Sequence, residues 1–295
     1  MGYNEAMFPS VDTRQPTEVE IEVQRIFHEM YPTADRYVIH KAFGWITDCF
    51  NGKYGNYQPI DALYHDLEHT LQGTLCLVRL LQGRHQAGAK PELNARQFEL
   101  GLLAILMHDT GYLKTRDDTV GTGAKYTPIH VDRSAEFAAV FLREKGYAEP
   151  EIRAVQNMIH CTGVNVNLAA IPFAEEWERT VGFALGSADL LGQMAADDYV
   201  DKLPILYEEF EEAARFNKGT GTLVGNFASA LDLMEKTPLF WEKYVLVKLE
   251  RDFNGLYHFL RRPYPDGPNP YIQRIEANLQ KLRERLEKLR REAGK

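Results

Sequence analysis

Two histidines four residues apart, followed later by an adjacent His-Asp pair, are the residues of this chain best suited to chemistry. His65 and His69 lie in the segment Tyr-His-Asp-Leu-Glu-His, and His108 and Asp109 end an apolar run that begins at Leu100. Residues four apart share one face of a helix, so the first pair predicts two imidazoles directed at one point. A carboxylate without a partner at the end of a buried helix is costly, and a bound metal ion would remove that cost. The pattern therefore predicts a metal site.

Further candidate ligands follow along the chain, in helical and apolar surroundings. Four histidines and two aspartates, counted without His65, form a mixed nitrogen and oxygen donor set. Such a set suits Mn, Fe, Co, Ni or Zn better than Ca or Mg, and it is large enough for two divalent ions bridged by a carboxylate such as Asp109. The predicted metal ligands are His69, His108, Asp109, His130, His160 and Asp189. Two such ions can hold a hydroxide between them and clamp a phosphoryl oxygen.

The elements that must position these residues are predicted to be helices, because nearly every periodic segment repeats its apolar residues every three to four positions. The predicted helices span 17–30, 34–50, 65–82, 96–108, 131–145, 150–160, 175–192, 199–216, 237–260 and 270–292. Alternating strand patterns are scarce, so the predicted fold is an all-α helical bundle. We expect an N-terminal helical extension over 1–35, a metal-binding domain over 36–200, and C-terminal helices over 201–295 that pack on it.

The final predicted helix is amphipathic. Its apolar residues alternate at four- and three-residue spacing between many charged ones, which indicates packing on the rest of the chain or pairing with a second copy. They are Ile275, Leu279, Leu282, Leu286 and Leu289.

Composition limits the classes of function. The chain has 295 residues, of which 44% are hydrophobic and 26% charged, and a net charge of -8. No basic stretch precedes the final helix, which disfavours binding to duplex nucleic acid. Neither a signal peptide nor a membrane span is indicated. The three cysteines, Cys49, Cys76 and Cys161, lack CxxC spacing, which argues against a disulfide framework and a thiolate zinc site, and fits a soluble protein of the reducing cytoplasm.

The order of these residues resembles that of the HD-domain metal-dependent phosphohydrolases, over about residues 36 to 200. His108-Asp109 is similar to the family's doublet at the end of an apolar helix. His130, with Ser134-Ala135 after it, His160, and Asp189 in Ser-Ala-Asp-Leu-Leu resemble the later ligands. The resemblance implies an all-α fold, two metal ions and hydrolysis of a phosphate ester through a metal-bridging hydroxide.

A narrower resemblance concerns the first motif. The segment from Tyr64 to Thr70 is similar to the Tyr-His-Asn-x-x-His-Ala segment of class I cyclic nucleotide phosphodiesterases, with Asp66 in place of Asn. By this resemblance His65 is the acid that protonates the leaving oxygen, and His69 is a metal ligand. An imidazole can donate a proton near neutral pH. The implied substrate is a small phosphate ester such as a nucleotide.

Residues around the predicted site can serve the substrate and the ligands. Lys114, Arg116 and Arg133 are the nearest cations in the sequence that can hold a phosphate. Asp61 and Glu68 flank the first histidines and can orient an imidazole from behind, as metal-bound histidines require.

Two other functions fit part of the sequence. Mixed-valent di-iron oxygenases of the HD superfamily are built from the same four histidines and two aspartates, but they do not need the acid role implied for His65. A degenerate HD domain that binds a nucleotide without catalysis would usually have lost ligands, whereas all six are present here. Metal-dependent hydrolysis of a phosphodiester is therefore the preferred hypothesis.

Overall fold

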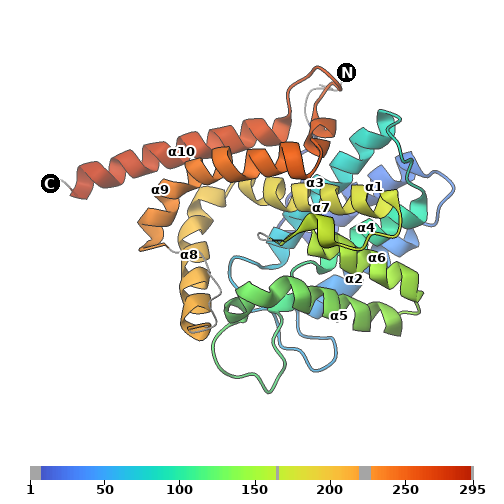
Figure 1. The fold of residues 1–295 in the computed structure, drawn as a ribbon, viewed down its shortest axis with the longest axis horizontal. Helices are drawn as coiled ribbons and strands as arrows, with labels where there is room; N and C mark the ends of the chain where they lie inside the picture. Colours follow the sequence, from blue (N-terminus) through green and yellow to red (C-terminus); the bar gives the residue numbers. More distant parts are fainter. Residues whose placement is uncertain (1–7, 164–165, 219–226, 294–295) are drawn as a thin grey trace.

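The protein is helical throughout the part of the chain that the computed structural model describes, residues 8–163, 166–218 and 227–293 (Figure 1). Its ten α-helices in those ranges are α1 (Pro16–Met30), α2 (Tyr37–Phe50), α3 (Leu67–Gln86), α4 (Ala95–Met107), α5 (His130–Glu144), α6 (Glu149–His160), α7 (Glu176–Met194), α8 (Tyr199–Phe216), α9 (Ala230–Phe240) and α10 (Pro270–Ala293). The same ranges contain two isolated β-bridges, Asn51 with Pro59 and Tyr57 with Thr115, and no strand. The predicted all-α class is confirmed.

Several short helical turns connect these helices. They are η1 (Thr110–Tyr112), η2 (Gly123–Ile129), η3 (Leu168–Ala170), η4 (Trp241–Val245), η5 (Lys248–Asp252) and η6 (Leu256–Leu260). The helix predicted over 237–260 is the one that differs most from expectation: it is the end of α9 followed by π-helical turns at η4 and η5 and a 3₁₀ turn at η6. Pro238, which cannot donate a backbone hydrogen bond, lies just before the change.

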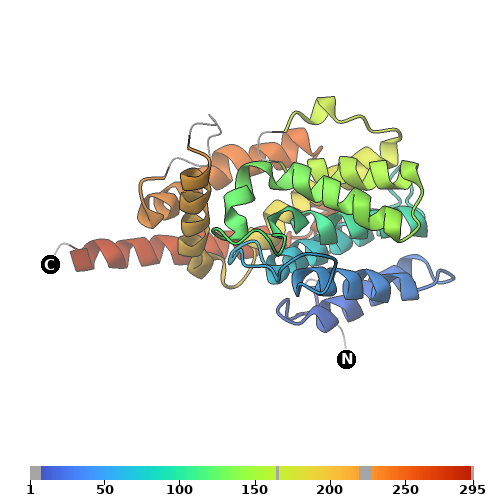
Figure 2. The same ribbon diagram turned by 90° about the horizontal axis from the view of Figure 1, so that it is seen from below.

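Helices α3 and α7 form the centre of the bundle, with α1 and α2 on one side and α5 and α6 on the other (Figure 2). Every residue of α3 from His69 to Arg84 is buried. The two central helices approach closely because α7 presents Gly192 to the backbone of Gln72, where a Cβ atom would lie 2.8 Å from the Gln72 carbonyl carbon. This close contact brings the start of α3 next to Asp189 of α7.

One hydrophobic core runs through the described chain, from Val19 in α1 to Leu286 in α10. The N-terminal helix and the C-terminal helices therefore share their core with residues 36–200, and the boundary expected after residue 200 falls inside α8. Ile275, Leu279 and Leu282 of α10 are buried, as is Leu286, while Leu289 is exposed. The apolar stripe of α10 thus packs on its own chain, and pairing with a second copy stays a prediction.

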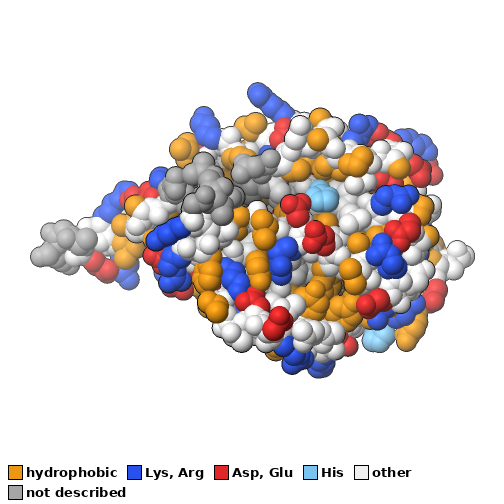
Figure 3. Space-filling view, turned by 60° about the horizontal axis from the view of Figure 1, so that its bottom comes forward, with side chains coloured by type: hydrophobic (Ala, Val, Ile, Leu, Met, Phe, Trp, Pro, Cys, Tyr) orange, Lys and Arg blue, Asp and Glu red, His pale blue; other side chains and the backbone are white. Residues whose placement is uncertain are grey.

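Two observations concern the surface and the possibility of a membrane-spanning helix. On the face shown in Figure 3, lysine and arginine side chains alternate with aspartate and glutamate and form no continuous basic area. Among the helices of the described ranges, none combines the length and the apolar character that crossing a bilayer requires.

Candidate metal centre

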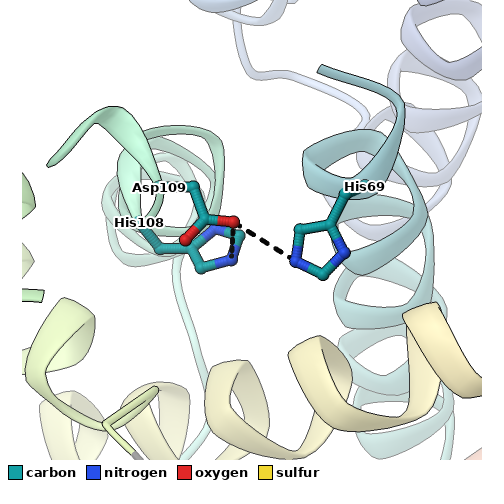
Figure 4. Close-up of side chains that lie close together, drawn as sticks. All are labelled: His69, His108 and Asp109. Carbon is teal, nitrogen blue, oxygen red and sulfur yellow. Dashed lines mark ion pairs between the residues drawn. The ribbon is translucent and has the colours of Figure 1, made fainter. Parts of the chain in front are cut away.

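Three of the predicted ligands meet in the interior, between the start of α3 and the end of α4 (Figure 4). His69 lies in the first turn of α3, and His108 and Asp109 follow the last residue of α4. The Asp109 Oδ2 atom lies 3.1 Å from His108 Nε2 and 3.2 Å from His69 Nε2. One potential ligand atom from each of the three residues lies within 4.8 Å of the others.

Asp189 of α7 completes this group. Its Oδ1 atom lies 3.4 Å from both His69 Nε2 and His108 Nε2. Two imidazoles and two carboxylates, from three helices, thus direct their polar atoms at one another. We call His69, His108, Asp109 and Asp189 the inner group.

The chemistry of the inner group fits a divalent metal ion. The Nε2 atom of His108 and Oδ2 of Asp109 are fully enclosed and lie 3.1 Å apart, but neither makes a hydrogen bond of good geometry within the described residues, which is costly for buried polar atoms. Burial alone would lower the pKa of His69, but Asp109 and Asp189 outweigh it and raise that pKa to about 9. The pKa of Asp109 is correspondingly lowered by its histidine neighbours, against the effect of burial. A divalent ion would take over the role of the protons that hold the imidazoles and carboxylates together.

The second oxygen of Asp109 faces a different histidine. Asp109 Oδ1 lies 3.9 Å from Nε2 of His130, the first residue of α5. The backbone of η1 packs directly on His130, since a Cβ atom at Gly111 would lie 2.0 Å from the His130 carbonyl oxygen. The two oxygens of one carboxylate therefore point toward two sets of histidines, as a bridging ligand requires.

Backbone carbonyl oxygens orient the imidazole rings of two predicted ligands. The His108 Nδ1 atom lies 2.7 Å from the Ile105 carbonyl oxygen, and His130 Nδ1 lies 2.6 Å from that of Thr127. A protonated Nδ1 that donates to a carbonyl leaves Nε2 as the atom that can bind a metal. Burial lowers the pKa of His130, which favours the neutral imidazole that a metal needs.

His160 lies apart from the inner group. It ends α6, and its Nε2 atom lies 3.3 Å from Asp132 Oδ1 of α5. The His160 side chain is 33% exposed and that of Asp132 is 77% exposed. We call His130, His160 and Asp132 the outer group; Asp132 was not among the predicted ligands.

The prediction that His65 and His69 share one helical face is wrong. Helix α3 begins at Leu67, because the Asp66 side chain caps it and accepts a hydrogen bond from the His69 backbone N–H at 2.8 Å. His65 lies before the helix. Its ring is nevertheless close to the inner group, with its centroid 5.3 Å from that of His69.

Two residues that the sequence analysis did not select hold His65 in place. Its Nδ1 atom lies 2.6 Å from Oε2 of Glu209, a buried residue of α8, while Glu209 Oε1 accepts from the Tyr64 backbone N–H. The ring of Tyr112 stacks on His65 at a centroid distance of 4.4 Å and on His130 at 4.7 Å. The contact with Glu209 occupies Nδ1 of His65 and leaves Nε2 as its other ring nitrogen.

The cations predicted to hold a phosphate make contacts within the protein, and their binding of a phosphate stays a prediction. Lys114 is buried, with its Nζ atom 2.7 Å from Asp61 Oδ2. Arg133 donates to the carbonyl oxygens of Gly111 and Leu113, and Arg116 donates to that of Gly52. These contacts fix the loops around η1.

The two predicted supporting carboxylates also lie elsewhere. Asp61 pairs with Lys114 and accepts from the Gly123 backbone N–H, and Glu68 pairs with Lys202 at 3.1 Å. Among the described residues, neither carboxylate forms a hydrogen bond or an ion pair with an imidazole. The orienting role expected of them belongs to the backbone carbonyls at His108 and His130, and to Glu209 at His65.

Comparison with known proteins gives one family match. Residues 117–258 match the Npun_R2479-like family, whose description states no activity. The matched segment includes the outer group, Asp189 and Glu209, and it excludes His65, His69, His108 and Asp109. No curated protein matches the chain.

Proposed function

We propose that this protein is an HD-type, metal-dependent phosphohydrolase that acts on a phosphodiester or another small phosphate ester. The inner group would hold one ion, and Asp109 Oδ1 with His130 and His160 would hold a second. Bound divalent ions of this kind lower the pKa of a coordinated water and polarise a phosphoryl oxygen. The observation that supports this proposal is that the enclosed Nε2 of His108 and Oδ2 of Asp109 lie 3.1 Å apart without a hydrogen bond of good geometry.

The observation that favours hydrolysis is the pairing of His65 with Glu209. Phosphate esters with poor leaving groups need a proton on the departing oxygen as the P–O bond breaks. With Nδ1 held by Glu209 at 2.6 Å, the Nε2–H of His65 can supply that proton to a substrate beside the inner group. The buried carboxylate would also hold the ring in the orientation that this transfer needs.

The local environment of Cys161 argues against a mechanism with a cysteine nucleophile. Cys161 follows the predicted ligand His160, but it is fully buried, and burial raises the pKa of its thiol to about 12. A thiol in such surroundings is not ionised at neutral pH and does not attack a phosphate.

The proposal is tested with a panel of metals and substrates. The metal-free protein is loaded with Mn, Fe, Co, Ni or Zn and assayed on cyclic nucleotides, linear dinucleotides and monoesters, with oxygen uptake recorded in parallel. We expect metal-dependent release of an alcohol or nucleotide, its loss in Asp109→Ala, and its persistence in His28→Ala, an exposed histidine far along α1. Oxygen uptake by the iron-loaded protein with inert esters would instead favour the di-iron oxygenase.

A further inference from the structure

One fully buried tyrosine contacts both the proposed acid and a predicted ligand of the second ion. Tyr112, the last residue of η1, is 0% exposed. Its ring centroid lies 4.4 Å from that of His65 and 4.7 Å from that of His130, with ring planes tilted by 14° and 24°. The tyrosine ring therefore stacks on two imidazoles that come from different parts of the chain.

The three ring centroids show how this stack is arranged. The centroids of His65 and His130 are 6.1 Å apart, and their planes make an angle of 37°. Two rings stacked on opposite faces of a third ring would lie at least about 7 Å apart, because each van der Waals contact takes about 3.5 Å. Both imidazoles therefore lie side by side on one face of Tyr112, which is a shared support for them.

Backbone contacts fix the position of this support. The Tyr112 backbone N–H donates to the Asp109 carbonyl oxygen at 3.1 Å. A Cβ atom at Gly123 would lie 2.1 Å from the Tyr112 carbonyl oxygen, so η2 packs directly on η1 at this point. The preceding residue, Gly111, donates its N–H to the Ser134 side chain of α5 at 2.8 Å. Tyr112 is therefore held both to the predicted ligand Asp109 and to α5.

The ring of Tyr112, and not its hydroxyl group, makes the contacts with the imidazoles. The hydroxyl oxygen is fully enclosed near Thr127 and makes no hydrogen bond of good geometry within the described residues. An aromatic ring is flat and rigid, so two imidazoles that stack on it keep their planes and their separation. An aliphatic side chain has no flat face and would let each imidazole turn separately.

The two supported histidines have different roles in the proposed reaction. His65 would protonate the leaving oxygen, and His130 would hold the second ion together with Asp109, whose Oδ1 atom lies 3.9 Å from His130 Nε2. Proton transfer requires the donor to lie within hydrogen-bond distance of the departing oxygen while the ions hold the phosphate. A fixed separation between the acid and the second ion therefore favours the reaction.

We propose that Tyr112 is a positioning residue that sets the separation between His65 and the second ion. The inference rests on the proposed function. It assigns to a fully buried residue a role in the reaction that is exerted through the acid and through a metal ligand, and not by contact with the substrate.

The test compares Tyr112→Leu, which loses the flat ring, with Tyr112→Phe, which keeps it. With both ions saturating, Tyr112→Leu should lower kcat and kcat/KM together by about ten- to a hundredfold, because a misplaced acid affects the transition state and not substrate binding. It should also weaken binding of the second ion by roughly tenfold, while the affinity of the inner group for its ion stays within a few fold. Tyr112→Phe should match wild type in each measurement. Tyr112→Met, whose flexible side chain fills irregular space, replaces Tyr112→Leu if that variant does not fold.

A control separates positioning from a general loss of stability. Phe98 is also fully buried, and it packs on Phe27 of α1 near the start of α4, whereas His108 follows the end of that helix. Phe98→Leu should lower the melting temperature about as much as Tyr112→Leu does but leave turnover and metal affinity unchanged. The proposal is overturned if Phe98→Leu causes the same loss of turnover, if Tyr112→Phe loses as much as Tyr112→Leu, or if Tyr112→Leu behaves as wild type.

A second measurement uses the metal-free protein and needs no turnover. The ring current of an aromatic ring shifts protons above its face upfield in NMR spectra. Imidazole protons of both His65 and His130 should show this shift relative to the exposed His28, in wild type and in Tyr112→Phe but not in Tyr112→Leu. Shifts that do not differ between Tyr112→Leu and wild type would contradict the shared support.

Failure of this inference and failure of the proposed function would differ. If no ester is hydrolysed while Tyr112→Leu weakens binding of the second ion and removes both shifts, the proposed reaction fails and the support of the two histidines stands. If esters are hydrolysed and Tyr112→Leu turns them over as wild type does, only the Tyr112 proposal fails.

Discussion

The two halves of the candidate metal centre differ in how completely the protein encloses them. In the inner group the His108 side chain is 1% exposed, and its neighbours come from three helices of the core. In the outer group His160 is 33% exposed and faces Asp132, which is largely in solvent. Metal-binding side chains that core packing already holds in place lose little conformational entropy when an ion binds, whereas exposed side chains must first be ordered. The comparison predicts a tight inner metal and a weaker outer one, joined by Asp109.

The largest effect is expected from Asp109→Asn, because this residue of the inner group also faces His130 of the outer group through its second oxygen. The amide keeps the shape but lacks the charge that would bridge two cations, so both ions and all metal-dependent turnover should be lost. Elemental analysis and ester hydrolysis measure this, with His28→Ala as the control. If Asp109→Asn still bound an outer metal as wild type does, the two halves would be independent sites.

The next largest effect concerns His65, which touches neither predicted metal set through an ion pair. Its replacement by Gln should lower turnover by about 10²- to 10⁴-fold, as for removal of a general acid. Metal content should stay unchanged. The loss should be greatest for alkyl leaving groups and much smaller for 4-nitrophenolate, which departs without a proton. An equal loss for both leaving groups would argue against the acid role.

A smaller effect, on metal affinity, is expected from a change in the outer group alone. Asp132→Asn removes the charge that faces His160 at 3.3 Å. It should weaken the outer metal by roughly ten- to a hundredfold, as for loss of a residue that orients a ligand, while the inner affinity stays constant. Competition with a metal indicator resolves the two steps. An equal loss of affinity in both metal-binding steps would contradict the distinction between the inner and outer groups.

The smallest effect is a dependence on pH. The pKa of His69 in the metal-free protein is raised to about 9, so this imidazole is protonated at neutral pH and must release a proton when the inner metal binds. Inner-metal affinity should rise by about tenfold per pH unit for each proton released, until about pH 9. Correspondingly, the stability that protonated His69 gives the metal-free fold is present below about pH 6.5 and is lost as pH rises through 9. Binding enthalpies that do not change between buffers of different ionisation enthalpy would contradict the proton release.

The helices were predictable because their apolar periodicity is strong and their ends carry caps. Helix α8 has the predicted bounds, and Asn94 closes a capping box at the start of α4, one residue from the expected start. The start of α3 was misplaced by two residues because Asp66 was read as a variant of a motif position, when its side chain acts as an N-cap.

Site residues could be predicted where a recognisable sequence motif surrounds them. They could not be predicted where only tertiary packing brings them to the site. His108 and Asp109 are adjacent in the sequence and converge with His69 and Asp189. Glu209 lies 144 positions from His65 in a helix of many acidic residues, so no local signal distinguishes it. Lys114 and Arg133 were selected because they lie near the site in the sequence. In the structure Lys114 forms an ion pair with Asp61, and Arg133 donates a hydrogen bond to the Gly111 carbonyl oxygen.

Anomalous diffraction from crystals of zinc-loaded protein tests the central claim most directly. The account predicts a strong peak between α3, α4 and α7, within about 2.0–2.3 Å of the Nε2 atoms of His69 and His108 and of oxygens of Asp109 and Asp189. A second, weaker peak should lie between Asp109 Oδ1, His130 and His160. Zinc bound only elsewhere on the molecule, with the inner group still paired as it is here, would contradict the account.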